Sequence, residues 1–234
     1  MQSRAAPASA DIPPGDSLRL VKKTKKLVRK AKSKHPSGIV DGCTDDVSYP
    51  EILGSFDATQ GAKLEKKLFP IPVPIDPVCD IPYEFEVGYD VRVNQSGVLS
   101  VVYDTASCCG AHPSFAKKFV NLSVPKGDAL TLKGLLQPTA LPRLRELLRP
   151  LLKKRFEGGD FESDIDEVLD QLTLAPADFS ISPRALELSA FNSQPHVVQA
   201  LYQDPFVVSF EKLSGSFRTP GPLDPLLGKV RQSK

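Results

Sequence analysis

YEFEVGYDVRVNQSGVLSVVYDTAS, residues 83–107, carries the strongest structural signal in the chain. From Tyr83 to Val93, aromatic and aliphatic residues alternate with charged residues and glycine, the period-two pattern of a strand with one buried face. Asn94-Gln95-Ser96-Gly97 supplies a turn, and the strand from Val98 to Tyr103 returns alongside. The stretch therefore predicts a β-hairpin with one apolar and one charged face.

Further elements are predicted on both sides of this hairpin. Strands are expected at 46–56, 114–122 and 206–210, and a second hairpin at 178–191. Helices are expected at 57–69, 139–156 and 164–173, where apolar residues recur at three- and four-residue spacing and Pro150 kinks or splits the second helix. The prolines between 70 and 77 predict an extended connector. Together these elements predict an α+β fold, a curved antiparallel β-sheet packed against two α-helices.

The composition fits this expectation. The chain has 234 residues, of which 41% are hydrophobic and 25% charged, so a wholly disordered or fibrous chain is excluded. The length is enough for a single domain with a sizeable core. No run approaches the ~18 apolar residues of a membrane-spanning helix.

The net charge of +2 is unevenly distributed. Residues 1–34 hold ten basic and two acidic residues, a net charge of +8, whereas residues 35–234 carry a net charge of −6. Residues 1–17 are rich in Ala, Pro and Ser and lack apolar periodicity. We therefore predict a disordered, basic leader at 1–34, one domain at 35–213 and a C-terminal tail at 214–234.

The basic run LRLVKKTKKLVRKAKSK, residues 18–34, has three interpretations. Clustered Lys and Arg bind nucleic acid or anionic membranes by neutralising phosphates. Alternatively, the run is a solvated flexible arm, or an edge strand that its lysines protect from aggregation. No aromatic residue is interleaved to stack on bases, so a nucleic-acid partner is disfavoured.

The N-terminus leaves the compartment open. A signal peptide needs an apolar segment of roughly 7–15 residues, and none is present, although Ala8-Ser9-Ala10 has the form of a cleavage site. Either an export signal is missing from this sequence, or the chain starts in the cytoplasm.

Four cysteines offer three alternative chemistries. Cys43, Cys79, Cys108 and Cys109 are even in number, which favours one or two disulfides in an exported protein, with connectivity left open. A metal site on Cys108, Cys109 and His112 lacks an evident fourth ligand, and no zinc spacing is present. A Cys109–His112 nucleophile pair is the third alternative. No cofactor and no metal are expected.

Several short motifs follow one another along the chain in a characteristic order. The first two are Val47-Ser48-Tyr49-Pro50-Glu51-Ile52, and Val98-Leu99-Ser100-Val101 followed by Gly110-Ala111-His112-Pro113. Asn121-Leu122-Ser123 then leads to Leu130-Thr131-Leu132, and Phe179-Ser180-Ile181-Ser182 leads to Val207-Val208-Ser209-Phe210. Over about residues 40–213 this series resembles the extracytoplasmic domain family shared by the lysozyme-sensing anti-sigma factor RsiV, the N-terminal region of the deacetylase PdaC and a secreted mycobacterial antigen. Ser123 and Lys133 depart from it, standing where acids are often seen.

The resemblance implies a periplasmic or secreted protein without catalytic residues of its own. We therefore expect a non-catalytic cell-envelope binding protein whose protein partner is a lysozyme-like muramidase, which the acidic body would attract. The alternatives are a peptidoglycan-binding accessory module using aromatic residues such as Tyr103, and a hydrolase using the Cys109/His112 loop. Candidate binding residues are Tyr103, Gly110, His112 and Pro113, although hydrogen bonding within its loop is the favoured explanation of His112.

Overall fold

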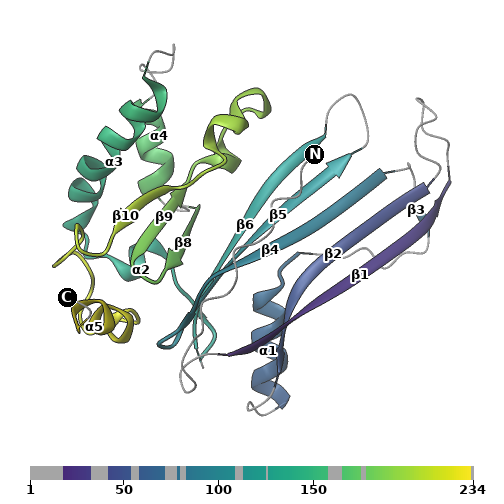
Figure 1. The fold of residues 1–234 in the computed structure, drawn as a ribbon, viewed down its shortest axis with the longest axis horizontal. Helices are drawn as coiled ribbons and strands as arrows, with labels where there is room; N and C mark the ends of the chain where they lie inside the picture. Colours follow the sequence, from purple (N-terminus) through teal and green to yellow (C-terminus); the bar gives the residue numbers. More distant parts are fainter. Residues whose placement is uncertain are drawn as a thin grey trace.

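The structure is a computed structural model with two β-sheets and several helices (Figure 1). It describes residues 18–32, 42–53, 58–71, 78–79, 83–108, 113–124, 126–157, 165–174 and 178–232.

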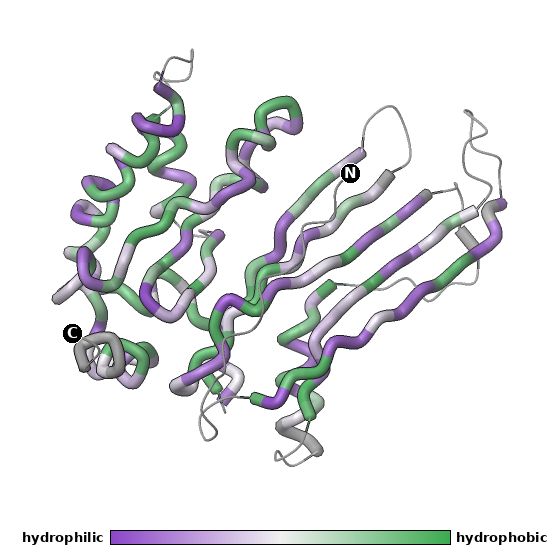
Figure 2. The backbone as a smooth tube through the Cα atoms, viewed as in Figure 1, coloured by the Kyte–Doolittle hydropathy of each residue, from purple (hydrophilic) through white to green (hydrophobic). Residues whose placement is uncertain are grey.

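The larger sheet has seven strands in the order β3-β1-β2-β4-β5-β6-β7. Its bounds are β1 Arg19–Ala31, β2 Gly42–Leu53, β3 Val78–Cys79, β4 Tyr83–Gln95, β5 Val98–Cys108, β6 Ser114–Ser123 and β7 Asp128–Ala129. The pairs β1–β3 and β2–β4 are parallel, and the other neighbours are antiparallel. Figure 2 shows hydrophilic and hydrophobic residues interspersed along these strands, as the period-two pattern requires.

The β4–β5 hairpin confirms the prediction for residues 83–107. Ser96 and Gly97 both have positive φ, 53° and 74°, which a two-residue turn matched to the twist of the strands requires. The register shifts between Val91 and Val93, so Arg92 sits at a bulge. A bulge re-aims the side chain of its extra residue, and Arg92 reaches out of the sheet to the second layer.

The basic segment is not a disordered leader over residues 19–31, and this part of the prediction is wrong. These residues form β1, which pairs with β2 from Arg19 opposite Leu53 to Lys30 opposite Gly42. Arg29 is buried and binds Asp45 of β2 through Nε at 3.0 Å and a terminal nitrogen at 2.9 Å. The edge-strand alternative fits, since only the two-residue β3 lies outside β1. Residues 1–17 lie outside the described residues.

Helix α1, Ala58–Leu68, covers one face of the larger sheet. Its Leu64 and Leu68 are buried in a hydrophobic cluster with Val47, Val87 and Tyr103 from three strands. This is the core that the hairpin's apolar face predicts, because Phe85, Val87 and Tyr89 all point toward it.

The second layer is built around a three-stranded antiparallel sheet, β10-β9-β8. The strands are β8 Asp178–Ser182, β9 Ala185–Ser189 and β10 Phe206–Ser209, and the helices are α2 Leu132–Leu135, α3 Ala140–Phe156 and α4 Ile165–Thr173. Two short 3₁₀ segments, η2 Phe191–Ser193 and η3 His196–Tyr202, join β9 to β10. A second hydrophobic cluster fills the space between these helices and strands. Pro150 lies inside α3, which continues through it.

The C-terminal region is not a tail. Helix α5, Asp224–Gln232, begins near the end of the chain, and Leu223 and Leu226 are buried in the second cluster. Phe217 forms an isolated β-bridge with Leu136 and is also buried. The sequence prediction missed this because Pro and Gly residues in 214–234 obscure the helical pattern.

The α+β class, with a sheet packed against helices, is confirmed. The predicted arrangement differs in detail. There are two sheets, and the larger one contains two parallel pairs. Helices α3 and α4 pack with the smaller sheet, while α1 packs against the larger one. The predicted connector falls largely at residues 72–77, outside the described part of the chain.

Candidate functional site

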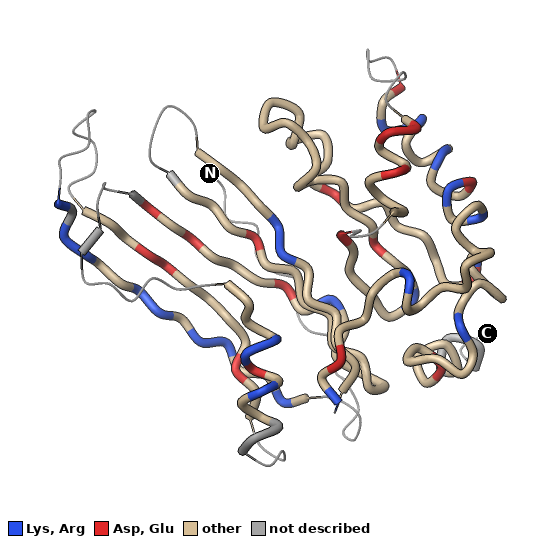
Figure 3. Tube along the Cα trace, turned by 180° about the vertical axis from the view of Figure 1, so that it is seen from behind, with Lys and Arg blue, Asp and Glu red and all other residues tan. Residues whose placement is uncertain are grey.

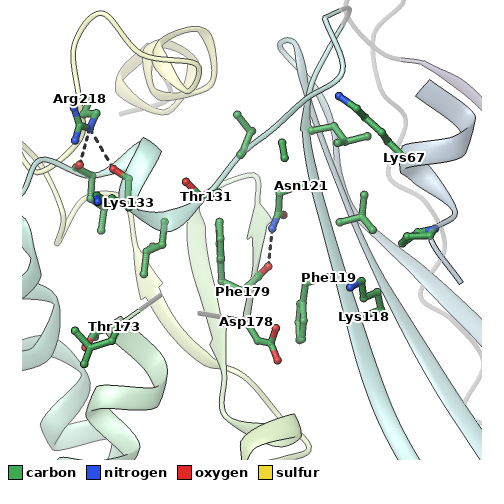
Figure 4. Close-up of a pocket in the computed structure, with 18 of the residues that line it drawn as sticks. Lys67, Lys118, Phe119, Asn121, Thr131, Lys133, Thr173, Asp178, Phe179 and Arg218 are labelled. Carbon is green, nitrogen blue, oxygen red and sulfur yellow. Dashed lines mark hydrogen bonds between the residues drawn. The ribbon is translucent and has the colours of Figure 1, made fainter. Parts of the chain in front are cut away.

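A large groove lies between the two layers, with a volume of about 1180 Å³ (Figure 4). Helix α1 and strand β6 contribute to one wall, and α2, the end of α4 and β8 contribute to the other. This volume exceeds the ~300–1,000 Å³ of typical ligand pockets. The groove is therefore large enough for a ligand of considerable length.

The floor of the groove is apolar. Its side chains come from β6, the β7–α2 segment and β8, and include Val120, Leu122, Leu130, Leu132, Leu136 and Phe179. Leu174, at the end of α4, lines the groove and is 54% exposed, whereas most large apolar side chains of the described chain are buried. An apolar floor with an exposed leucine favours a ligand with an apolar body.

The charged residues that line the groove are almost all cationic. Among the described residues of the lining they are Lys63, Lys66 and Lys67 of α1, Lys118 of β6, Lys133 of α2 and Arg218, with Asp178 as the one carboxylate. Arg218 donates from Nε to the carbonyls of Lys133, at 3.3 Å, and Leu136, at 3.0 Å, which fixes its guanidinium beside α2. Lys67 donates to the carbonyl of Gly127. The groove is thus lined by positive charge on both walls.

Asp178 is held in a small polar network. It accepts a hydrogen bond from Asn192 Nδ2 at 2.6 Å, and the same amide nitrogen donates to the carbonyl of Lys117 at 2.7 Å. Burial raises the pKa of Asp178, against the hydrogen bond from Asn192 and the charge of Lys118, which both lower it. Asn192 also accepts from the backbone N–H of Lys117 at 2.8 Å, so it satisfies both edge-facing groups of that β6 residue.

Side-chain hydrogen bonds join the two sheets beneath the groove. Asn121 of β6 donates to the carbonyl of Phe179 at 2.8 Å, and Ser100 of β5 accepts from the N–H of Ile181 at 3.0 Å. Ser100 and Asn121 also bind each other at 2.6 Å. These bonds satisfy the edge of β8 without a strand ladder and hold the two walls together.

Arg92 makes the second connection between the layers. Its Nε and a terminal nitrogen bind the two carboxylate oxygens of Glu187 on β9 at 2.8 and 2.7 Å. Glu187 is 5% exposed and also accepts from Ser180 at 2.8 Å. The hydrogen bond to Glu187 is the main cause that raises the pKa of Arg92. This two-point pair fixes the relative orientation of the sheets.

The face of the larger sheet opposite α1 packs against the second layer near the hairpin, through Val93, Val98 and Ser100, and is exposed and acidic farther along the strands. Glu84, Glu86 and Asp90 alternate with core-facing residues of β4 and are exposed. The register places Asp46 of β2 opposite Glu86 and Asp104 of β5 opposite Gly88 on the same face. Figure 3 shows these acidic strands beside the basic strand β1. We call these five carboxylates the acidic face.

Two members of the acidic face already have partners. Asp90 pairs with Arg92 at 2.6 Å, and Asp104 pairs with Lys117 at 2.7 Å. Within the described chain, Asp46, Glu84 and Glu86 form no ion pair. A side chain added at Gly88, in the middle of this face, would meet nothing within 4 Å. The acidic face is therefore uncovered, with spare negative charge.

The residues predicted to bind a ligand do not come together in the groove. Tyr103 is fully buried under α1, where its hydroxyl donates to the carbonyl of Leu68 at 2.5 Å. Burial raises its pKa, with a smaller contribution from Tyr89. Pro113 is exposed at the start of β6, and Gly110 and His112 lie outside the described residues. Tyr103 is a core residue and offers no open aromatic surface to a glycan.

The cysteines give little further chemistry. Cys43 is fully buried on β2, whereas Cys109 and the side chains of Cys79 and Cys108 lie outside what is described. Among the described residues, no three His, Cys, Asp or Glu side chains are grouped so as to hold a metal ion. The same residues include no helix long and apolar enough to cross a membrane.

Sequence reasoning missed the groove because its lining comes from segments far apart in the chain. The sequence places Lys66 and Lys67 in an ordinary helix and Arg218 in a C-terminal tail, with nothing that links them to one site. The lysines at the end of α1 could have been noticed as one signal, but nothing in the sequence places them opposite Lys133.

Comparison with known proteins gives a fold and no activity. No protein-family model and no curated protein matches the chain. A member of the DUF3298 family from Bacteroides fragilis has a similar structure, with a TM-score of 0.60 and 12% identity over 93% of this chain and 100% of its own. A DUF3298 family protein from Pseudomonas aeruginosa has a TM-score of 0.55 and 12% identity, over 87% of this chain and 96% of its own. The chain thus has the fold of these DUF3298 family proteins.

Proposed function

We propose that this protein is a non-catalytic binding protein of the cell envelope or the secreted fraction, whose acidic face docks a cationic protein of the lysozyme-like muramidase class. The single observation that carries the proposal is the row formed by the exposed Glu84 and Glu86 and the half-buried Asp46 on the exposed part of this sheet face. Complementary charge accelerates encounter and fixes orientation more than it adds affinity.

The folded part of the chain does not carry a net negative charge. Arg4, Asp11 and Asp16 are the only charged residues before Leu18, so residues 18–234 carry 29 Lys and Arg and 26 Asp and Glu. Because the basic segment is a strand of the sheet, the body is not acidic overall. Attraction for a cationic partner must come from the acidic face, and the lysines of β1 along its border would restrict how the partner sits.

The extracytoplasmic location belongs to the same proposal. Four cysteines, an even number, suit one or two disulfides in an oxidising compartment. Trapping free thiols in protein taken from its native cells tests this: fewer than four reactive cysteines are expected after denaturation, and four reactive cysteines would contradict the location.

The binding test uses the full chain and a purified lysozyme. We expect binding that weakens as salt is raised, because screening shortens the reach of surface charges to about 10 Å at 0.1 M ionic strength. The double variant Glu84→Lys/Glu86→Lys is expected to weaken binding at least about tenfold, about 1.4 kcal/mol. Glu146→Lys/Glu157→Lys makes the same charge change at exposed positions of α3 and its C-terminal cap, and is expected to bind as the parent does.

Two results would remove the proposal. One is no binding of lysozyme at low or moderate salt. The other is equal weakening by the two double variants, which would mean that net charge alone, and not the acidic face, governs the association.

A further inference from the structure

We propose that the groove between the two layers binds a long-chain anionic amphiphile, of the fatty-acid class, with its chain on the apolar floor and its carboxylate against the lysines of the walls. This is a second binding site, independent of the acidic face. The charge of the groove, its apolar lining and the paired edge of β6 favour this class of ligand.

The first step is charge complementarity. The described residues that line the groove include six cationic side chains and one carboxylate, and that carboxylate, Asp178, accepts a hydrogen bond from Asn192. Lys63, Lys66, Lys118 and Lys133 form no ion pair with another residue of the described chain. An anionic group at either wall would therefore meet cations that are not already paired with a carboxylate.

The second step is the apolar interior. The floor is formed by aliphatic side chains and Phe179, and Leu174 adds an exposed leucine that a bound chain would cover. Removing apolar surface from water contributes roughly 25 cal/mol per Å², so a long alkyl chain gains more than a short one. A small inorganic anion would use the lysines but leave the floor exposed.

An extended peptide fits the groove less well than an amphiphile. A peptide adds to a sheet through unpaired backbone groups along an edge. On β6, Asn192 binds both groups of Lys117, and the carbonyl of Asn121 accepts from Leu130 N at 2.8 Å. Between Lys117 and Asn121, Phe119 alone keeps both of its edge-facing groups, because alternate residues of a strand face the same edge. One residue is too short a template for an added strand.

The test measures binding of hexadecanoate to the full chain by calorimetry, below the concentration at which the probe forms micelles. We expect a 1:1 complex that binds at least about tenfold more tightly than hexadecanol, which has the same chain without the charge. Octanoate, with the same charge and a shorter chain, is expected to bind more weakly than hexadecanoate.

Two matched variants locate the site. Leu174→Glu places a carboxylate at the exposed leucine of the groove and is expected to weaken hexadecanoate binding at least about tenfold. Val197→Glu makes the corresponding apolar-to-acidic change at a residue that is 87% exposed and lies outside the groove lining, and is expected to leave binding unchanged. Both positions are exposed, so neither change should unfold the protein.

Several outcomes would overturn the proposal. Hexadecanoate does not bind, or hexadecanol binds equally well, or both variants behave alike. An acidic peptide of alternating Glu and Leu that binds where hexadecanoate does not would assign the groove to peptides. Lysozyme binding is measured on the same variants and is expected to be unchanged by Leu174→Glu, so failure here is distinguishable from failure of the acidic face.

Discussion

The acidic face and the groove are opposite in both charge and shape. The acidic face is an open sheet surface with carboxylates on β2, β4 and β5, whereas the groove is concave, apolar and lined by lysines. Strand β5 carries the last carboxylate of the acidic face, and its neighbour β6 forms part of the groove wall. One sheet can therefore present two surfaces suited to unlike partners. The acidic face arises because side chains alternate between the two faces of the sheet, and the groove arises where the last strands of the sheet meet the second layer.

The comparison depends on the two layers keeping one arrangement, and breaking the Arg92–Glu187 pair should have the largest effect. Arg92→Met is expected to lower the free energy of unfolding by about 2–3 kcal/mol, because it leaves a buried carboxylate without its cation. The measurement is urea denaturation followed by circular dichroism. Asp90→Asn removes the exposed partner of the same arginine and should change stability by less than about 0.5 kcal/mol. Equal losses in the two variants would mean that the pair does not join the layers.

The next largest effect concerns the larger layer alone. Tyr103→Phe is expected to cost about 1–2 kcal/mol, because the carbonyl of Leu68 loses its buried donor. Tyr89→Phe, at a half-buried tyrosine, should cost less. If the two variants are equally stable, the hydrogen bond to α1 does not contribute.

Tyr103 also predicts a pH dependence. Its pKa is raised in the folded state by burial, so the native state keeps a proton that the unfolded state releases above about pH 10. Its contribution therefore makes stability fall as the pH rises above about 10. Tyr103→Phe should flatten this fall in denaturation curves, whereas an unchanged slope would contradict the assignment.

The smallest effect is expected at Asp178 in the groove. Because burial raises its pKa, the charged form destabilises the fold, and stability falls as the pH rises from about 4 through the pKa of the folded state. Asp178→Asn removes this cost and should raise stability at neutral pH by no more than about 0.5 kcal/mol. The same variant should bind hexadecanoate more tightly, since it removes the one carboxylate of the lining. Weaker binding would mean that the groove does not favour anions.

The strongly patterned elements could be predicted from sequence. The hairpin at 83–107, the helices over 139–156 and 164–173 and the hairpin at 178–191 have the expected periodicity, and all four form. In each case the buried residues recur at every turn of a helix or at every second residue of a strand, so local sequence is sufficient to predict the element.

Strand β1 could not be predicted in the same way. Its lysines show no apolar alternation, and it is held by the backbone ladder to β2 and by the pair between Arg29 and Asp45, a partner sixteen residues away. A charged run carries no local mark of such pairing, so tertiary contacts override the expectation of disorder. For Tyr103 the opposite holds. The alternating pattern of residues 83–107 correctly predicts that Tyr103 lies in a strand, but no local pattern predicts its hydrogen bond to the carbonyl of Leu68 in α1.

The groove lay beyond prediction for the same physical reason. Lys66, Lys133 and Arg218 come from three segments that only the packing of the two layers brings to one site. The acidic face can be predicted in part from the sequence, because Glu84 and Glu86 alternate with core residues of β4. Asp46 joins them only through the parallel pairing of β2 with β4.

Hydrogen–deuterium exchange of the full chain with and without lysozyme, at low salt, tests the central claim most directly. Docking at the acidic face should slow exchange in β4 and β5, over residues 84–90 and 102–106, and leave α1 and α2 on the groove walls unchanged. Protection confined to α1, α2 and β6, or no protection anywhere, would contradict docking at the acidic face.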